Sequence, residues 1–258
     1  MNRFITLIVL LSVTACVFAK KKPEYPRAAI KVGYNYHEKF MRGNVEYAEH
    51  DIPMVLLANP EQSKFYCPAT EYKDSLESTP SGRAKAKQIF DIAVKKYIES
   101  KDESAMSNVV YKTFIYVFKD NAREAMTVYD KAGMTERGVY EEPFSELTWE
   151  TGDSTKTVLG YECIMATTDY HGRKWTAWFA PEIPVNDGPW KLRGLPGLIL
   201  EATDDKGHHR FVAEGVEESS QPMYPIYSQN EYDRMKRLDM LRSLRTVSYT
   251  HLRAHETG

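Results

Sequence analysis

A mainly β fold is predicted for this chain: a strongly curved antiparallel sheet or half-barrel with one amphipathic helix packed on it. Three observations support this prediction. Several segments alternate apolar and polar residues, loops ending in glycine separate consecutive pairs of these segments, and one stretch alone shows helical spacing. Consecutive hairpins pair antiparallel, and a long sheet with one helix tends to curl around that helix.

The first strands should follow a charged, proline-bearing lead-in. Val32, Tyr34 and Tyr36 alternate with polar residues, which gives this segment one aromatic face. Two short strands are expected on either side of the Asn59-Pro60 turn.

The one predicted helix runs from Thr79-Pro80 to about Ser100. Thr79 suits the N-cap and Pro80 the first helical position. The single apolar stripe predicts that the helix lies across the concave face of the sheet, with partner binding as the alternative. The stripe consists of Ile89, Phe90, Ala93, Val94, Tyr97 and Ile98.

Strands dominate the rest of the chain. Two hairpins should turn at 169–172 and 204–207, where Gly172 and Gly207 tolerate the left-handed backbone that closes such loops. A weak polar helix from Asn230 to Leu244 is expected to close the interpretable chain. The other predicted strands are 108–120, 125–130, 137–142 and 146–150, the last burying Leu147 and Trp149.

The N-terminus resembles an export signal. Arg3 precedes the apolar run Phe4 to Leu11, and the small-residue pattern ending at Ala19 is typical of signal-peptidase cleavage. In the alternative, Val13 to Cys16 resembles a lipobox, which would make Cys16 a lipidated first residue. Both interpretations predict a location in the periplasm or cell envelope.

The expected organisation has five parts. Residues 246–258 lack apolar periodicity and look like translated adaptor sequence, with a short basic tail as the alternative. The parts are a signal peptide (1–19), a lead-in (20–28), a β-rich domain (29–218), a linker with a weak helix (219–245) and a non-native tail (246–258).

Composition limits the partners. The chain has 258 residues and a formal charge of −2, so no basic field favours nucleic acid or anionic lipid. A monomer is expected. After signal removal Cys67 and Cys163 remain, either joined as a disulfide, which an exported protein can keep, or buried as separate thiols.

The glycine-rich stretch from Gly188 to Asp205 is interpreted as scaffolding. Pro196 and Gly197 suit the central positions of a type II turn, and Leu198 then begins a strand. A phosphate-binding loop would instead need a helix behind it.

Positions 194–199 read Gly194, Leu195, Pro196, Gly197, Leu198, Ile199. This segment, with its context from Tyr161 onward, resembles the signature of the GLPGLI family of exported Gram-negative envelope proteins. The resemblance covers about Ile30 to Val216. It implies a β-rich secreted domain of unassigned function, and it brings no catalytic residue with it.

No catalytic motif is present: the chain lacks GxSxG, SxxK and HExxH patterns. His208 and His209 are weak metal candidates, because adjacent strand residues point to opposite faces. No cofactor is predicted.

Aromatic residues gather between Trp149 and Trp190. Trp175 and Phe179 should share one face of a strand and Trp178 the other, which suits a ligand cleft unless both faces are buried. The candidate cleft residues are Trp149, Tyr161, Trp175, Trp178, Phe179 and Trp190.

The functional hypothesis is a non-enzymatic binding or accessory module that holds an apolar or peptide ligand or docks an outer-membrane partner. The alternatives are a metal-dependent enzyme or metal carrier using His208 or His209, and a purely structural interaction module. The partner, whether an outer-membrane or periplasmic protein, a peptide or a lipid, is not identified by the sequence.

Overall fold

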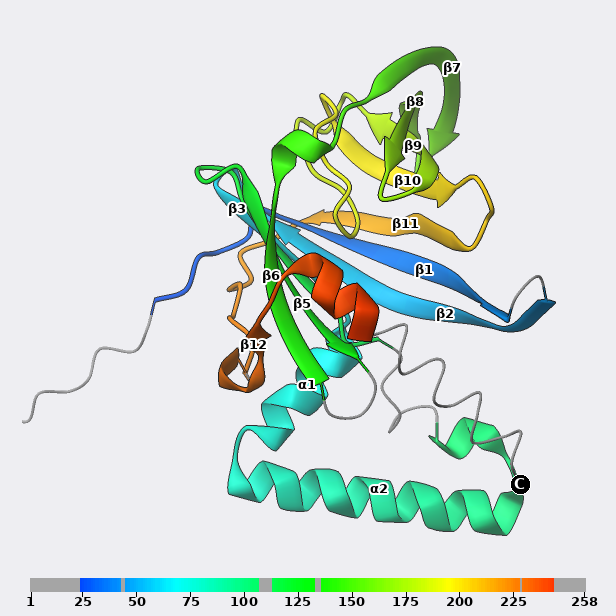
Figure 1. Cartoon of the computed structure of the whole chain (residues 1–258), viewed down its shortest axis with the longest axis vertical. Helices are drawn as coiled ribbons and strands as arrows, with labels where there is room; N and C mark the ends of the chain where they lie inside the picture. The colour runs from blue at the N-terminus through cyan, green and yellow to red at the C-terminus, as the bar shows by residue number, and fades with distance from the viewer. Residues whose placement is uncertain (1–23, 43–44, 107–112, 133–135, 228, 244–258) are drawn as a thin grey trace, which may run out of the picture.

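The computed structural model describes residues 24–42, 45–106, 113–132, 136–227 and 229–243. Over these residues the strands form one sheet in the order β12-β6-β5-β4-β3-β2-β1-β11-β10-β9-β8-β7 (Figure 1). The expected signal peptide, with Cys16, and the expected non-native tail (246–258) lie outside the described residues. None of the helices in the described ranges is long and apolar enough to cross a membrane.

The strand bounds follow the alternating segments of the sequence. The strands are β1 (Ile30–Arg42), β2 (Val45–Ala58), β3 (Gln62–Tyr66), β4 (Tyr116–Asp120), β5 (Ala125–Ala132), β6 (Glu136–Pro143), β7 (Glu150–Val158), β8 (Tyr161–Tyr170), β9 (Arg173–Ala180), β10 (Leu198–Asp204), β11 (His209–Glu218) and β12 (Asp233–Arg234). The helices are α1 (Pro68–Glu77) and α2 (Pro80–Ser100), with 3-10 turns η1 (Glu103–Met106), η2 (Phe144–Glu146) and η3 (Gln229–Glu231).

The predicted fold class is confirmed: the chain is mainly β, and its sheet is open and antiparallel apart from the short parallel pairing of β12 with β6. In the middle of the sheet, an early strand of the chain pairs with a late one. β1 pairs with β11, so that Ile30 lies opposite Glu218 and Glu38 opposite His209.

The sheet curls strongly. β5 and β9 are seven places apart in the sheet order, which in a flat sheet would separate them by about 34 Å. Even so, Val128 of β5 and Trp175 of β9 belong to one buried cluster. Lys191, which follows β9, also reaches the Tyr140 hydroxyl of β6 at 3.1 Å. Side chains therefore bridge the two limbs of a half-barrel across its concave face.

Alternation along the strands produces a core on each face. Met54 and Leu56 of β2 enter the cluster on the concave face, whereas Val55 and Leu57 enter a smaller cluster on the other face. Met223 and Ile226 complete that smaller cluster, so part of segment 219–245 packs against the back of the sheet.

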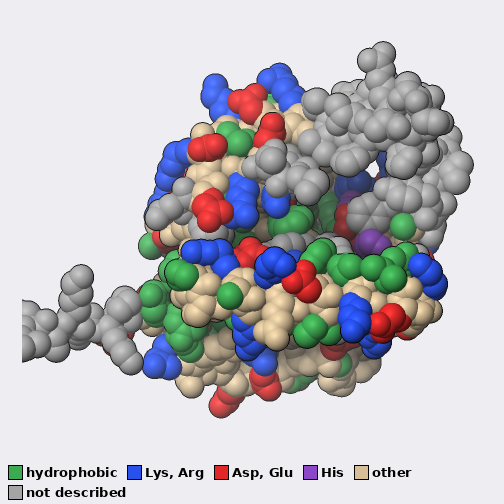
Figure 2. Space-filling view, turned by 90° about the horizontal axis from the view of Figure 1, so that it is seen from below, with side chains coloured by type: hydrophobic (Ala, Val, Ile, Leu, Met, Phe, Trp, Pro, Cys, Tyr) green, Lys and Arg blue, Asp and Glu red, His purple; other side chains and the backbone are tan. Residues whose placement is uncertain are grey.

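The predicted α2 has the expected ends. Thr79 is the N-cap and accepts a hydrogen bond from the Gly82 amide at 3.1 Å, Pro80 opens the helix and Ser100 ends it. Its predicted position is wrong, because α2 packs mainly on α1 and η1 instead of the concave face. Phe90 and Ile98 are 47% and 59% exposed. On the face viewed from below, hydrophobic side chains interrupt the charged ones (Figure 2).

The reason for this position is α1, which the sequence analysis missed. Only Ser78 and Thr79 separate the two helices, and so short a connection folds α2 back against α1. A different helix, over 237–243, reaches the concave face, where its Met240 is 1% exposed within the main cluster. The predicted helix from Asn230 therefore begins only at residue 237.

The turns confirm both predicted hairpins. β8 and β9 turn at His171 and Gly172 with φ of 53° and 76°, and Gly207 closes the β10–β11 turn with φ of 64°. A further hairpin at Leu159 and Gly160, between β7 and β8, was not predicted.

Two of the predicted strands differ from the structure. Within the described part of 108–120 only β4, from Tyr116, is a strand. The segment 146–150 is not a strand of its own, because η2 ends at Glu146 and β7 begins at Glu150. Leu147 and Trp149 nevertheless pack, partly buried, against the main cluster.

The type II turn at Pro196-Gly197 is a wrong prediction in detail. The Gly197 amide donates to the Leu195 carbonyl at 2.8 Å, and the Leu198 amide donates to Ile183 instead of closing the turn. Gly197 has φ of 158°, which differs from the value near +80° of a type II turn and is one that residues with a side chain rarely adopt. A Cβ there would also lie 2.3 Å from the Ala180 carbonyl oxygen, so glycine is required. The strand predicted from Leu198 is confirmed as β10.

Candidate functional site

A cavity of about 390 Å³ lies on the concave face of the sheet. Inward-facing side chains of several strands form its floor, and the loop after β9 and the helix over 237–243 form its sides. The residues that line it are Tyr36, Glu38, Met54, Phe65, Thr113, Ile115, Asp130, Tyr140, Tyr170, His171, Arg173, Trp175, Trp190, Lys191, His209, Phe211, Arg237 and Leu241.

Stacked rings form one wall of the cavity. Tyr36 of β1 and Phe211 of β11 face each other in register and stack at 4.5 Å between ring centroids. Trp175 of β9 lies 6.3 Å from Phe211 and 5.6 Å from Trp190. This continuous aromatic surface results from β pairing, since Tyr36 and Phe211 are cross-strand partners.

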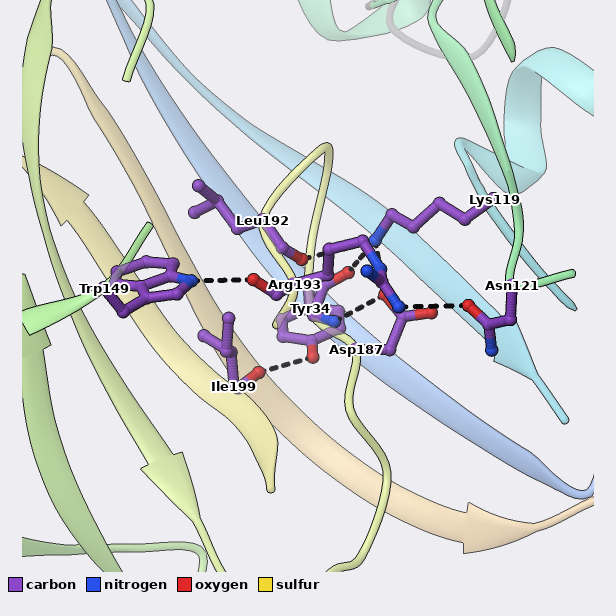
Figure 3. Close-up of polar contacts among 9 residues, drawn as sticks. Tyr34, Lys119, Asn121, Trp149, Asp187, Leu192, Arg193 and Ile199 are labelled. Carbon is purple, nitrogen blue, oxygen red and sulfur yellow. Dashed lines mark hydrogen bonds and ion pairs between the residues drawn. The ribbon is translucent and has the colours of Figure 1, made fainter. Parts of the chain in front are cut away.

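A buried lysine holds the loop that carries Trp190 and Lys191. Lys119 of β4 is 1% exposed, pairs with Asp187 and donates to the carbonyls of Gly188 at 2.8 Å and Leu192 at 3.3 Å (Figure 3). A buried ammonium is tolerated only when its charge and its donors are satisfied. The loop therefore has one fixed position over the sheet.

Further hydrogen bonds secure the C-terminal part of this loop and the start of the strand that follows it. The Trp149 indole donates to the Arg193 carbonyl at 2.7 Å, and Arg193 donates to Asn121 at 3.0 Å. On the sheet beneath, the Tyr34 hydroxyl donates to the Ile199 carbonyl at 2.7 Å (Figure 3). Trp149 is therefore a support of the loop.

Trp190 adopts a left-handed backbone with φ of 52°. This conformation costs a residue other than glycine about 1–3 kcal/mol, and such strain is concentrated at ligand clamps and active sites. Here it turns the ring toward Trp175 and Tyr170, with centroids 5.6 and 5.9 Å away.

A buried carboxylate on β6 connects that strand to the loop after β9 and to the helix over 237–243. Glu142 of β6 is 3% exposed and forms ion pairs with Lys191 at 2.8 Å and Arg237 at 2.7 Å. The hydroxyl of Tyr170 and the ring of His171 approach it to 3.4 Å. Burial alone would raise the pKa of Glu142, but its contacts with His171 and Lys191 lower that pKa to about 2. Glu142 is therefore ionised.

Two other carboxyl groups, those of Asp130 and Glu38, face the cavity and form no ion pair with the residues that the structure describes. Burial raises the pKa of Asp130 to about 6 and also raises the pKa of Glu38, where the charge of Asp130 adds to the effect. The neighbouring His209 has its pKa lowered to about 4, first by burial and then by Arg173. At neutral pH its ring is uncharged and lies 2.8 Å, through Nδ1, from the Tyr36 hydroxyl.

Only two residues of the predicted aromatic cleft, Trp175 and Trp190, line this cavity. Phe179 shares the inward face of β9, as predicted, but is buried in the core at 1% exposure. Trp178 lies on the opposite face, where Lys156 covers its ring at 4.5 Å. Tyr161 lines a separate depression of about 670 Å³ beside Ile183.

The structure also places the cysteines and histidines. Cys67 and Cys163 are free thiols buried in the main cluster, which matches the second of the two alternatives. His209 contacts Tyr36, while His208 precedes β11. In the described ranges no group of three His, Cys, Asp or Glu residues could hold a metal ion.

Sequence reasoning missed most of the charged residues in the cavity. Glu38 continues the inward row of Tyr34 and Tyr36, and Asp130 continues the inward row that passes through Val128. A charged residue at an inward-facing strand position was the signal that could have identified both.

Comparison with known proteins gives limited matches. Residues 169–201 match the model of a family described as a protein of unknown function (Porph_ging). The matched segment covers the β8–β9 turn, β9, the loop after β9 and the start of β10. No curated protein matches the chain.

Two solved structures are similar in fold. PNGF-II in a P21 crystal form has a TM-score of 0.54, 11% identity, and coverage of 85% of this chain and 34% of that chain. PNGF-II in a C2 form has a TM-score of 0.51, 11% identity, and coverage of 84% and 33%. The chain thus spans about a third of the length of PNGF-II, and at this identity the likeness concerns the fold alone.

Proposed function

We propose that this protein is a non-enzymatic binding module that holds a peptide-like ligand in the cavity on the concave face. The observation that carries the proposal is a cavity of about 390 Å³, within the size range of ligand sites, whose walls combine stacked rings with buried ionisable groups. The charged groups favour a polar ligand over a lipid chain. The larger depression beside Ile183 lacks the stacked rings.

The experiment compares two substitutions on one helix. Leu241 lines the cavity at 41% exposure, whereas Leu238 is 60% exposed and does not line it. Leu241→Trp should obstruct the cavity, and Leu238→Trp is the matched control. Purified protein would be tested with peptide, glycan and lipid extracts by thermal unfolding and calorimetry.

A ligand at one hundred times its Kd should raise the Tm of the unsubstituted protein and of Leu238→Trp by roughly 5–10 °C. Leu241→Trp should show no such increase. The proposal fails if no extract protects the protein, or if both variants respond equally.

The location and family belong to the same proposal. We infer that the chain is exported to the periplasm or cell envelope and is a GLPGLI protein. Support comes from the signal-like segment 1–19, the motif at 194–199 and the family match over 169–201. Mass spectrometry of protein expressed in a Gram-negative host tests this: a chain starting at Lys20 indicates cleavage after Ala19, and a lipid on Cys16 indicates anchoring. An uncleaved cytoplasmic product contradicts export.

A further inference from the structure

The cavity has two carboxylates that no cation neutralises directly. Glu38 and Asp130 both line it, and neither forms an ion pair within the described ranges. They lie on different strands, β1 and β5, yet they are close enough for the charge of Asp130 to affect Glu38. Two carboxylates therefore share one cavity.

The cationic side chains Arg173, Lys191 and Arg237 of the cavity already form ion pairs. Arg173 pairs with Asp204, and Lys191 and Arg237 both pair with Glu142. Counting these two partner carboxylates together with Glu38 and Asp130, four carboxylates face three cations. The site therefore carries an excess of negative charge.

The aromatic wall is suited to the same kind of ligand. The faces of Trp, Tyr and Phe rings attract cations, and Trp does so most strongly. Lys191 already shows this contact, since its ammonium lies 5.2 Å from the centre of the Trp190 ring and 4.9 Å from that of Tyr140. Tyr36, Trp175 and Phe211 line the same cavity, so a ligand cation there would lie beside further aromatic rings.

A separate observation points to a hydrogen-bond acceptor on the ligand. The indole N–H of Trp175 is buried and has no partner in the part of the chain that the structure describes. Buried donors are rarely left unsatisfied, because each costs free energy. A carbonyl group of a ligand in this cavity would supply the missing acceptor.

We propose that the cavity recognises an organic cation, an ammonium or guanidinium group, bound by Glu38 and Asp130 against the aromatic wall, with Trp175 donating to a nearby carbonyl. This rests on the proposed function and specifies its ligand. A lysine or arginine side chain of a peptide has both groups, whereas a free polyamine has the cation alone.

The test is calorimetric titration of the full chain at pH 7.5 with four probes. Nα-acetyl-lysine methylamide and Nα-acetyl-arginine methylamide are the cationic probes, and Nα-acetyl-norleucine methylamide is the neutral isostere of lysine. Spermidine separates a free amine from a peptide. We expect at least tenfold tighter binding of the cationic amides than of the neutral one.

The variants Glu38→Gln and Asp130→Asn remove charge with little change in volume. Each should weaken binding of the cationic amides by about tenfold to hundredfold. Glu214→Gln is the matched control, because Glu214 is an exposed carboxylate of β11 outside the cavity lining, and it should bind like the unsubstituted protein. Circular dichroism confirms that all three variants fold.

The outcomes are distinct. Measurable and equal binding of the lysine and norleucine amides, or unchanged binding in both cavity variants, overturns the cation proposal. If spermidine binds and neither amide does, the ligand is a free amine and the hydrogen bond from Trp175 to a ligand carbonyl is overturned. If no cation binds but another ligand is blocked by Leu241→Trp, the cation proposal falls and the binding function stands. If Leu241→Trp blocks nothing, the binding function itself fails.

Discussion

The buried carboxyl group of Asp130 destabilises the folded protein at neutral pH. Burial raises its pKa to about 6, above the value near 4 of an unfolded chain, so the folded state binds its proton more tightly. Its destabilising effect is therefore absent below pH 4, grows as the pH rises, and is complete above pH 6.

We predict that Asp130→Asn raises the free energy of unfolding at pH 7 by about 1–3 kcal/mol, at 1.36 kcal/mol per pKa unit. At pH 3 the variant and the unsubstituted protein should be equally stable. Urea denaturation at both pH values measures this, with Asp169→Asn on the exposed part of β8 as control. Equal stability at pH 7 would contradict the burial of Asp130.

Glu142 should behave in the opposite way. Its pKa of about 2 lies below the unfolded value, so its contribution is fully present above about pH 4.5 and is lost as the pH falls toward 2. Glu142→Gln leaves Lys191 buried without a counterion, so we predict a loss of about 3–5 kcal/mol at pH 7. The loss should shrink in acid denaturation series. A pH-independent effect would show that packing, not charge, decides.

These residues show what the sequence could predict of the site. Trp175 and Trp190 were identified because tryptophans are rare and clustered. Glu38 and Asp130 could have been predicted as cavity residues, because strand alternation alone places them on an inward face. Their meeting was not predictable, since it depends on how far the sheet curls.

At the scale of elements, the loop after β9 depends on Lys119. We predict that Lys119→Met destabilises the protein by about 3–5 kcal/mol, because it removes the ion-pair partner of Asp187 and the ammonium donor of two carbonyls. Released from this anchor, Trp190 should also lose its fixed environment, which near-UV circular dichroism would detect.

The control for this prediction is Lys156→Met. Lys156 also forms an ion pair, with Glu201 at 2.6 Å, but its side chain is 33% exposed, so its loss should cost less than about 1 kcal/mol. The double variant Lys119→Met/Asp187→Asn should recover part of the stability lost. If the two lysine variants are equally stable, the anchoring role of Lys119 is refuted.

The position of α2 leads to a prediction about local stability. Of its 21 residues only Gly82 and Ala93 are buried, so little apolar area opposes its opening. Its amides should exchange with deuterium faster than those of β1 and β11 in native-state mass spectrometry. Protection equal to that of β1 would mean that something covers α2 in solution.

Helix ends and helix packing differ in how far they can be predicted. Thr79 and Pro80 fix the start of α2 through local hydrogen bonding and a fixed φ, so the start was predictable. Its packing partner depends on α1, a short helix whose formation the local pattern did not reveal. Similarly, the sequence correctly indicates that position 197 needs a glycine. The reason is the close approach of the Ala180 carbonyl oxygen and not the predicted type II turn.

At the scale of the molecule, one continuous sheet predicts one cooperative unit. All four tryptophans lie between Trp149 and Trp190, on the limb formed by β7 to β10, whereas far-UV circular dichroism reports every strand. We predict that urea transitions followed by tryptophan fluorescence and by circular dichroism coincide. A separate, earlier fluorescence transition would show that the predicted domain 29–218 consists of two units that unfold independently.

The fold class was predictable because alternation and glycine turns are local signals repeated along the chain. The order of the strands was not, since β1 pairs with β11 and no short-range pattern records that choice. The same pairing creates the cavity, because it brings Tyr36 against Phe211.

The β1–β11 pairing also has a consequence for how the protein acquires its shape. Ile30 can meet Glu218 only after the segment between them has left the ribosome, and closing so large a loop carries an entropic penalty that local hairpins avoid. Until β11 is synthesised, the edge of β1 opposite β2 has unpaired backbone N–H and C=O groups. Such an edge can pair with other chains, so we expect a chaperone to protect it during synthesis.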